Sequence, residues 1–227
     1  MSKNVIYVGA HSDDILSIAG TMCLLSENGY KVHEFCITRG EAGHGIDSEW
    51  AAKRSKEEEN VCKIIGADLK FFDQEDGAVY ADKAICEEIA KEFERLKPVA
   101  VFTTWALEKP DHAAVCQIAS KALNLAGLNW TTELYMTKVD IQSYSYKPEM
   151  YINVSSVMDK VQAIADCYQC QDAQPFVVHT LQSKRNLGEE MFVDAAESVM
   201  YFTPPINERW NRECEVGRLI RGLRSKN

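Results

Sequence analysis

The sequence predicts an α/β fold with a mostly parallel sheet, and three features of the chain support this. Short segments rich in β-branched and aromatic residues alternate with longer segments of helical periodicity. The length of 227 residues suits a single domain with a sizeable core. No repeat or linker-like stretch interrupts the alternation. Because helices between consecutive strands imply right-handed crossovers, we expect these strands to run parallel in one sheet.

The expected elements follow one another in β-then-α order. The strands are Asn4 to Gly9, Val32 to Thr38, Leu69 to Phe72, Val99 to Thr104 and Leu134 to Val139. Helical spacing occurs in Ile15 to Glu27, Trp50 to Ile65, Lys83 to Leu96 and Ala113 to Leu125. The α/β pattern continues less regularly toward the C-terminus. We expect there a strand at Met150 to Val154, a helix through Ser155 to Gln171 and an apolar run near Met191 to Tyr201. We expect one domain over residues 1–227, with a C-terminal tail from about residue 203.

Composition argues against several classes of protein. The net charge of −9 and the pI near 5.1 do not suit a nucleic-acid-binding surface, which needs clustered Lys and Arg. We see no secretory signal and no apolar run of the ~18 residues that a membrane span requires. The eight cysteines mostly lie in apolar runs, which favours free thiols and a cytoplasmic location. Cys167 and Cys170 form a C-x-x-C without a matching second pair, so we do not expect zinc or redox chemistry there.

A histidine and two adjacent aspartates follow the first strand, in the stretch VIYVGAHSDD. This places His11, Asp13 and Asp14 at the carboxyl edge of the sheet, where open parallel sheets bind ligands. Glycine-rich phosphate-binding patterns are absent from the sequence. A cation would stabilise the paired carboxylates, and nitrogen plus carboxylate suits Zn²⁺ better than Ca²⁺ or Mg²⁺. In an alternative role, Asp13 caps the next helix and Asp14 favours its dipole, but His11 is then unexplained.

A third ligand is expected at another strand end, because catalytic zinc usually takes three protein ligands and a water. The fourth strand is followed by WALEKPDHAAV, which brings Lys109, Asp111 and His112 to the same edge. His112 is the candidate ligand. In an alternative arrangement, Asp111 caps the helix from Ala113 and His112 only lies in its first turn. One of the adjacent aspartates could then bind metal while the other takes a proton from metal-bound water.

These motifs together resemble the PIG-L or LmbE-like zinc deacetylases, which remove acetyl groups from N-acetylglucosamine units of glycolipids, thiol cofactors, chitobiose and antibiotics. The match extends along most of the chain. The family's A-H-P-D-D-E is similar to AHSDDI, T-x-G-E-x-G to TRGEAGH at Thr38 to His44, and H-P-D-H to KPDH. Further similarities are an R-x-x-E helix (Arg54 to Glu57, then Ile65 and Gly66), an aspartate in DQEDG (Asp76), a lysine helix ending in S-Q (Lys160 to Gln171) and a late A-E pair (Ala196 and Glu197).

The resemblance implies a Rossmann-like three-layer sandwich (LmbE-like) and removal of the acetyl group from an N-acetylglucosamine-type amino sugar or conjugate. It implies one Zn²⁺ per chain, held by His11, Asp14 and His112, with Asp13 as the general base. Arg54 and Asp76 would hydrogen-bond the sugar hydroxyls; a surface ion pair and a turn aspartate are their alternative roles. The expected partner is a small-molecule amino-sugar conjugate, with no nucleic acid and no membrane span, and a homo-oligomer is left open.

The chain also departs from the family's pattern. Lys109 stands where the second motif usually has histidine, so the group that assists the oxyanion or the leaving amine has changed type. Ser12 and Ile15 replace a proline and a glutamate. Tyr168 stands where a histidine often precedes the S-Q pair, which reads Cys170 and Gln171.

Two other functions therefore stay open beside deacetylation. A non-catalytic member of the fold would bind a sugar without releasing acetate. A Ca²⁺-dependent hydrolase would instead release ribose from a nucleoside. The choice of aglycone would depend on loops such as Glu41 to Glu49 and Lys138 to Glu149.

Overall fold

The computed structural model describes residues 3–139, 143, 145–170, 174–202 and 215–222. A seven-stranded sheet runs through it in the order β3-β2-β1-β4-β5-β7-β6. Five strands are parallel neighbours: β1 (Asn4–Gly9), β2 (Lys31–Cys36), β3 (Asp68–Phe71), β4 (Ala100–Thr104) and β5 (Glu133–Thr137). β7 (Ala196–Tyr201) runs antiparallel to both β5 and β6 (Met150–Asn153). The prediction of an α/β fold with a mostly parallel sheet is confirmed.

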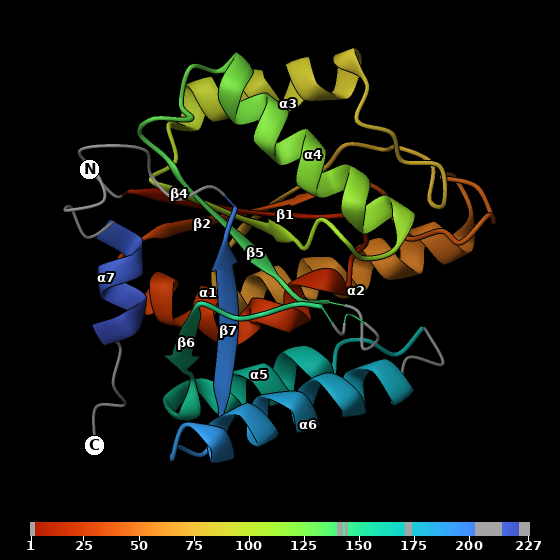
Figure 1. The fold of residues 1–227 in the computed structure, drawn as a ribbon. Helices are drawn as coiled ribbons and strands as arrows, with labels where there is room; N and C mark the ends of the chain where they lie inside the picture. The colour runs from red at the N-terminus through yellow and green to blue at the C-terminus, as the bar shows by residue number, and fades with distance from the viewer. Residues whose placement is uncertain (1–2, 140–142, 144, 171–173, 203–214, 223–227) are drawn as a thin grey trace.

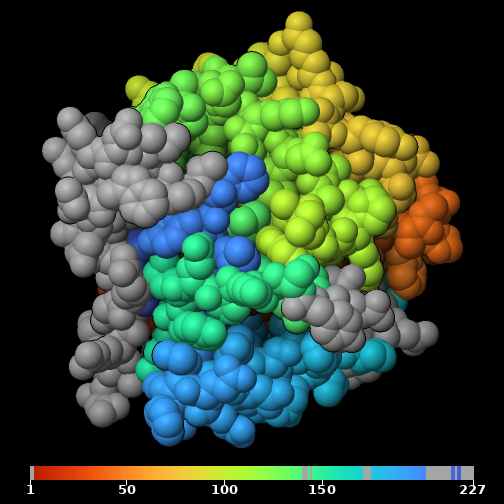
Figure 2. Space-filling view, viewed as in Figure 1, coloured from red at the N-terminus to blue at the C-terminus, as the bar shows by residue number. Residues whose placement is uncertain are grey.

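Helices cover both faces of the sheet (Figure 1). On one face lie α3 (Lys83–Leu96) and α4 (Pro110–Leu125). On the other lie α1 (Ala19–Glu27), α2 (Glu49–Ile65), α5 (Met158–Ala165) and α6 (Gln174–Glu190), while α7 (Glu215–Gly222) contacts β6. In the space-filling view the green α4 layer and the blue α6 layer lie at opposite sides of the molecule (Figure 2). This is the three-layer arrangement that the family resemblance implies.

Each face of the sheet has its own apolar core. Alternate residues of β1 point to opposite faces, so Val5 and Tyr7 pack toward α1 and α5, whereas Ile6 and Val8 pack toward α3 and α4. All four side chains are fully buried. A strand that is covered on both faces is apolar throughout, which explains the continuous apolar run at the start of the chain.

The first five strands and α1 to α4 lie within a few residues of their predicted positions, but several boundaries differ. The helix expected from Ile15 begins as a 3₁₀ turn, η1 (Asp14–Ile18), before α1. α4 starts at Pro110, because proline at the first position is preorganised for a helix. The segment expected as one helix from Ser155 comprises a 3₁₀ turn, η2 (Ser155–Val157), and α5. Gln171 and residues 203–214, where the predicted tail begins, lie outside the described residues.

No helix in the described ranges is long and apolar enough to cross a membrane. The seven cysteines that the structure describes are free thiols, including Cys167 and Cys170. Cys214 lies outside these ranges.

Candidate metal centre

The candidate centre lies where the strand order reverses. From β1 the chain moves outward to β2 and β3, then returns to place β4 on the other side of β1. Open α/β sheets bind ligands at the carboxyl ends of the strands beside such a switch point. His11 follows β1 by two residues, and His112 lies in the first turn of α4, after β4. The topology therefore brings residues about 100 positions apart in the chain to one crevice.

His11, Asp14 and His112 are brought together with ligand atoms all within 4.8 Å of one another. Asp14 Oδ1 lies 3.1 Å from His112 Nε2 and 3.7 Å from His11 Nδ1. Its other oxygen, Oδ2, accepts hydrogen bonds from the backbone N–H groups of Ala10 (2.7 Å) and His11 (3.0 Å). The backbone thus fixes one oxygen of Asp14 and leaves the other facing both imidazoles.

Carboxylates hold the second nitrogen of each imidazole. His112 Nδ1 lies 2.9 Å from Glu108 Oε2. Glu108 Oε1 is held in turn by Val139 N (2.8 Å) and Ser143 Oγ (2.9 Å). Histidines that ligate metals usually donate their other N–H to such a group, which fixes the tautomer and the ring orientation. Glu108 therefore sets up His112 Nε2 as the nitrogen free to bind a metal.

His11 has a similar environment on its second nitrogen. Its Nε2 lies 3.0 Å from Asp76 Oδ1 and 3.5 Å from Asp111 Oδ2. Asp76 is fixed by the N–H of Ala42 (2.7 Å). Asp111 accepts from the N–H groups of Gly77 (2.7 Å) and Val79 (3.3 Å). Asp111 therefore ties the loop after β3 to α4, whose N-cap has no side-chain hydrogen bond. The alternative role of Asp111 as the cap of α4 is not what the structure shows.

Burial and charge act in opposite directions on these groups. Burial lowers the pKa of His112, but the carboxylates of Asp14 and Glu108 outweigh it and raise that pKa to about 10. Burial also lowers the pKa of His11, and Asp111, Asp14 and Asp76 together raise it well above the ordinary value. Burial raises the pKa of Asp14, but His112 and His11 bring it well below its usual range. The negative environment thus favours a positive charge among these three side chains, which a metal ion can supply.

Asp13 has a different environment from its neighbour. Its Oδ1 accepts a 2.9 Å hydrogen bond from Arg54 Nη2, and its side chain does not cap η1. Arg54 Nε also donates to the hydroxyl of the buried Ser12 (3.2 Å), a contact that proline at this position could not make. Gly40, with φ of 65°, packs so closely that a Cβ there would overlap the Arg54 guanidinium. Arg54 is thus held on three sides and orients Asp13.

The other residues that the sequence singled out differ in their burial and in their distance from the metal ligands. Arg54 is nearly buried against Asp13 rather than forming a surface ion pair. Asp76 lies beside His11. Lys109 is the N-cap residue of α4, three residues before His112, and its side chain is exposed. Tyr168, which stands at a family histidine position, is buried and donates its hydroxyl to the carbonyl of Ser12 (3.0 Å).

A second buried cluster lies behind Tyr168. Glu34 on β2 and Glu58 on α2 are fully buried, and Cys62 donates its thiol to Glu34 Oε2 (3.0 Å). Glu58 Oε2 lies 3.2 Å from the Tyr168 hydroxyl. Burial raises the pKa of Glu34 to about 7, and burial together with the adjacent Glu34 raises the pKa of Glu58 well above its usual range. Burial and the proximity of the two carboxyl groups thus favour the protonated form of each.

Sequence reasoning missed Glu108 and the position of Asp111 beside His11. A signal for Glu108 was present, because it precedes His112 by four residues in EKPDH. The orientation of the Glu108 side chain depends on the loop after β5. The contacts of that loop with Glu108 cannot be predicted from a local sequence pattern.

Comparisons with known proteins identify the relatives of this chain. A sequence model of the PIG-L family, described as GlcNAc-PI de-N-acetylase, matches residues 6–123, which is more than half of the chain. A 4-oxalmesaconate hydratase of Pseudomonas putida is 26% identical over 232 residues, covering 88% of this chain and 86% of that protein.

Solved structures share the fold. The conserved protein TT1542 from Thermus thermophilus superimposes with a TM-score of 0.77 at 25% identity, over 92% of this chain and 99% of that one. The N,N'-diacetylchitobiose deacetylase of Pyrococcus horikoshii gives a TM-score of 0.73 at 20% identity, over 88% of this chain and 84% of that one. The family match, the fold and the ordered motifs agree, and the chain belongs to the PIG-L family.

Proposed function

We propose that the chain is a zinc-dependent N-deacetylase that releases acetate from an N-acetylglucosamine-type amino sugar or conjugate. The observation that carries the proposal is the separation of two adjacent aspartates into different environments. Asp14 has one oxygen fixed by backbone N–H groups and the other facing two imidazoles. Asp13 is oriented by Arg54 instead. In this arrangement one carboxylate would bind the metal and the other would accept a proton.

The donor set fits Zn²⁺. Two imidazole nitrogens and one carboxylate oxygen, from His11, His112 and Asp14, form the type of three-ligand set that leaves a position for water. Carboxylates behind both histidines supply the outer hydrogen bonds that such sites usually have. Zinc bound there would lower the pKa of a coordinated water and polarise a carbonyl group.

The chain's own residues would then move the proton. Asp13 is the proposed general base, because it directly precedes the proposed ligand Asp14 in the chain and its carboxylate is oriented by Arg54. The proton it accepts can pass to the leaving amine, so that the amine departs neutral. Lys109 is the proposed donor to the oxyanion or the leaving nitrogen, in place of the family's histidine. Arg54 and Asp76 are the proposed partners of the substrate's hydroxyl groups.

A second candidate function is hydration of an unsaturated carboxylate. The 4-oxalmesaconate hydratase from Pseudomonas putida favours it, since it is 26% identical over 88% of this chain. Both reactions begin by activating a water, so His11, Asp14, His112 and Asp13 would keep the same roles. They differ in the electrophile, which is an amide carbonyl in one case and a carbon–carbon double bond in the other.

One pair of assays distinguishes the candidates. Zinc-loaded enzyme is incubated with a panel of N-acetylglucosamine conjugates while released acetate is measured, and separately with 4-oxalmesaconate while loss of the conjugated absorbance is measured. The proposal predicts acetate release that disappears in Asp13→Asn. Hydration without acetate release would replace it with the second candidate. Saturable sugar binding without acetate, or ribose release from nucleosides with Ca²⁺, would instead support the two functions left open by the sequence.

A further inference from the structure

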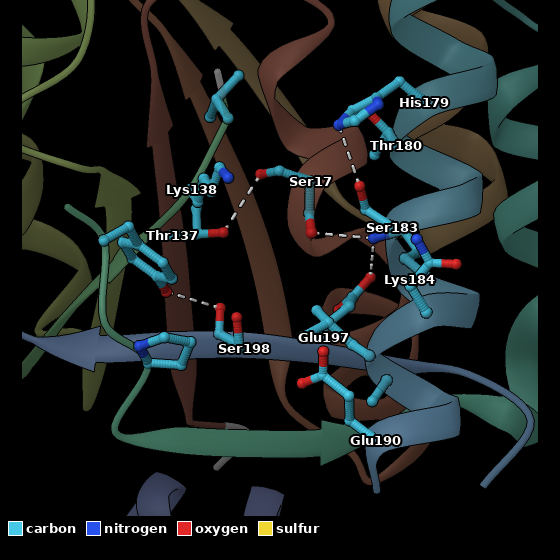
Figure 3. Close-up of a pocket in the computed structure, with 16 residues that line it drawn as sticks. Ser17, Thr137, Lys138, His179, Thr180, Ser183, Lys184, Glu190, Glu197 and Ser198 are labelled. Carbon is cyan, nitrogen blue, oxygen red and sulfur yellow. Dashed lines mark hydrogen bonds and ion pairs between the residues drawn. The ribbon is translucent and has the colours of Figure 1, made fainter. Parts of the chain in front are cut away.

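A cavity of about 300 Å³ lies between α6, the η1 turn, the end of β5 and the start of β7 (Figure 3). None of the proposed metal ligands, nor Asp13, is among the residues that line it. Its volume corresponds to roughly ten water molecules, which is enough for a small organic molecule. The cavity is therefore a candidate binding site with a lining distinct from the proposed metal ligands.

The side of α6 that faces the cavity is mostly polar, with Leu187 as an apolar member. His179, Thr180, Ser183 and Lys184 line the cavity at helical spacing, and Thr180 and Lys184 are buried. Figure 3 shows these side chains directed from α6 toward Ser17 and β7. A helix face turned inward normally carries apolar side chains, because unpaired polar groups are costly to bury. Such a polar inner face is typical of a site that binds a polar ligand.

A buried ion pair closes one side of the cavity. Lys184 Nζ donates to the Ser17 carbonyl (2.9 Å) and pairs with Glu197. Glu197 also accepts from the N–H groups of Gly20 and Thr21 and from the Thr21 hydroxyl. Both of its oxygens are thus satisfied within the protein. The ammonium of Lys184 has three N–H donors, and these two contacts leave one for a ligand.

The lining favours an anion that also carries hydroxyl groups. Lys138 and Lys184 offer N–H donors, whereas the carboxylate of Glu197 is already saturated. The hydroxyl groups of Ser183 and Ser198 can both donate and accept. Glu190, the other carboxylate of the lining, is exposed at the rim. We propose that this cavity is a second binding site, which takes a small hydroxylated carboxylate through Lys138, Lys184 and the surrounding hydroxyl groups.

The site adjoins the supports of the metal centre. Ser17, in the cavity wall, donates its hydroxyl to the backbone carbonyl of Asp14 (2.7 Å). Val139, also in the wall, donates its N–H to Glu108. Substitutions of either residue would disturb the metal centre as well. Variants that test the cavity must therefore lie elsewhere in its lining.

The test uses two probes of nearly identical shape, D-gluconate and D-sorbitol, which differ in that a carboxylate replaces a CH₂OH group. The binding of each probe to the zinc-loaded protein is measured by isothermal titration calorimetry. Gluconate is expected to bind at least about tenfold more tightly than sorbitol, which is the effect of one charge-assisted hydrogen bond. Lys138→Gln should weaken gluconate binding about tenfold, and Lys147→Gln, an exposed lysine in the same segment that does not line the cavity, should leave it unchanged.

Two further variants test the volume of the cavity and the sign of its charge. Ser183→Leu should fill the cavity and abolish gluconate binding, while Gln182→Leu on the exposed side of α6 should preserve it. Glu190→Gln should strengthen gluconate binding, because it removes a negative charge from the rim. Thermal unfolding confirms that each variant is folded. The proposal is overturned if neither probe binds saturably, if gluconate binds no better than sorbitol, or if Ser183→Leu binds gluconate as the parent protein does.

Discussion

Substitution of Glu108 by glutamine should weaken zinc binding by changing the tautomer of His112. In the parent protein, Glu108 Oε2 accepts from His112 Nδ1, which leaves Nε2 facing Asp14. Glu108 Oε1 accepts from Val139 N and Ser143 Oγ. A glutamine would keep its oxygen on the Val139 N–H and turn its NH₂ group toward His112. The imidazole must then accept at Nδ1 and carry its proton on Nε2, where it blocks the metal.

The expected magnitude follows from the role of outer carboxylates in metal sites. Loss of such a partner typically lowers metal affinity by about 10- to 100-fold. Glu108 is fully buried on its side chain, so water cannot replace it readily, and we expect the upper end of that range. Glu108→Ala places neither an acceptor nor a donor beside His112 Nδ1, so either tautomer of His112 can form. It should therefore retain more zinc affinity than Glu108→Gln.

Competition titrations with a chromophoric zinc chelator give the affinities of the parent and both variants. Circular dichroism and thermal unfolding check that each protein is folded. The control is Glu94→Gln, the same change at an exposed position on α3, which should bind zinc as the parent does. Parent-like zinc affinity in folded Glu108→Gln would refute the argument that Glu108 selects the tautomer of His112.

Three further predictions concern the acids and the lysine. Asp13→Asn should keep zinc and lose about 10²- to 10⁴-fold in turnover, whereas Asp14→Ala should lose zinc affinity itself; metal analysis beside rate measurement separates them. Lys109→Ala should lower turnover about 10²- to 10³-fold and Lys109→Arg should retain part of it, while unchanged rates in Lys109→Ala would identify a solvated loop charge. Because the pKa of Glu34 is raised from 4.5 to about 7 in the fold, unfolding releases its proton between these values. Stability to urea should therefore fall as pH rises through that window, and Glu34→Gln should reduce the fall; an equal slope in both proteins would contradict this origin.

The sequence predicted those parts of the fold that depend on local patterns of apolar and polar residues. β1 and α3 lie where the apolar pattern and the helical spacing place them. The antiparallel direction of β7 was not predictable, because it depends on how the chain returns to the sheet edge after α6. α6 itself was missed because its apolar stripe is short: Val177 and Leu181 are buried, but the polar Thr180 and Lys184 are buried beside them.

The candidate site shows the same division between local and long-range information. His11, Asp14 and His112 could be named from the sequence because each closely follows the end of a strand, and strand ends at a switch point share one crevice. The contact of Asp76 with His11 could not be predicted from the sequence, because it depends on the path of the loop after β3. The hydrogen bond between Asp13 and Arg54 was not predictable either. The two residues are 41 positions apart in the chain, and their contact depends on where α2 packs.

We propose that His11, Asp14 and His112 hold one zinc ion per chain. X-ray absorption at the zinc edge, on protein loaded with one equivalent of zinc, tests it most directly, because the chain offers a competing set that contains sulfur in Glu34, Glu58 and Cys62. We expect nitrogen and oxygen neighbours at about 2.0 to 2.2 Å, the scattering pattern of two imidazoles, and no sulfur neighbour. A sulfur shell near about 2.3 Å, or folded protein that binds no zinc, would contradict it.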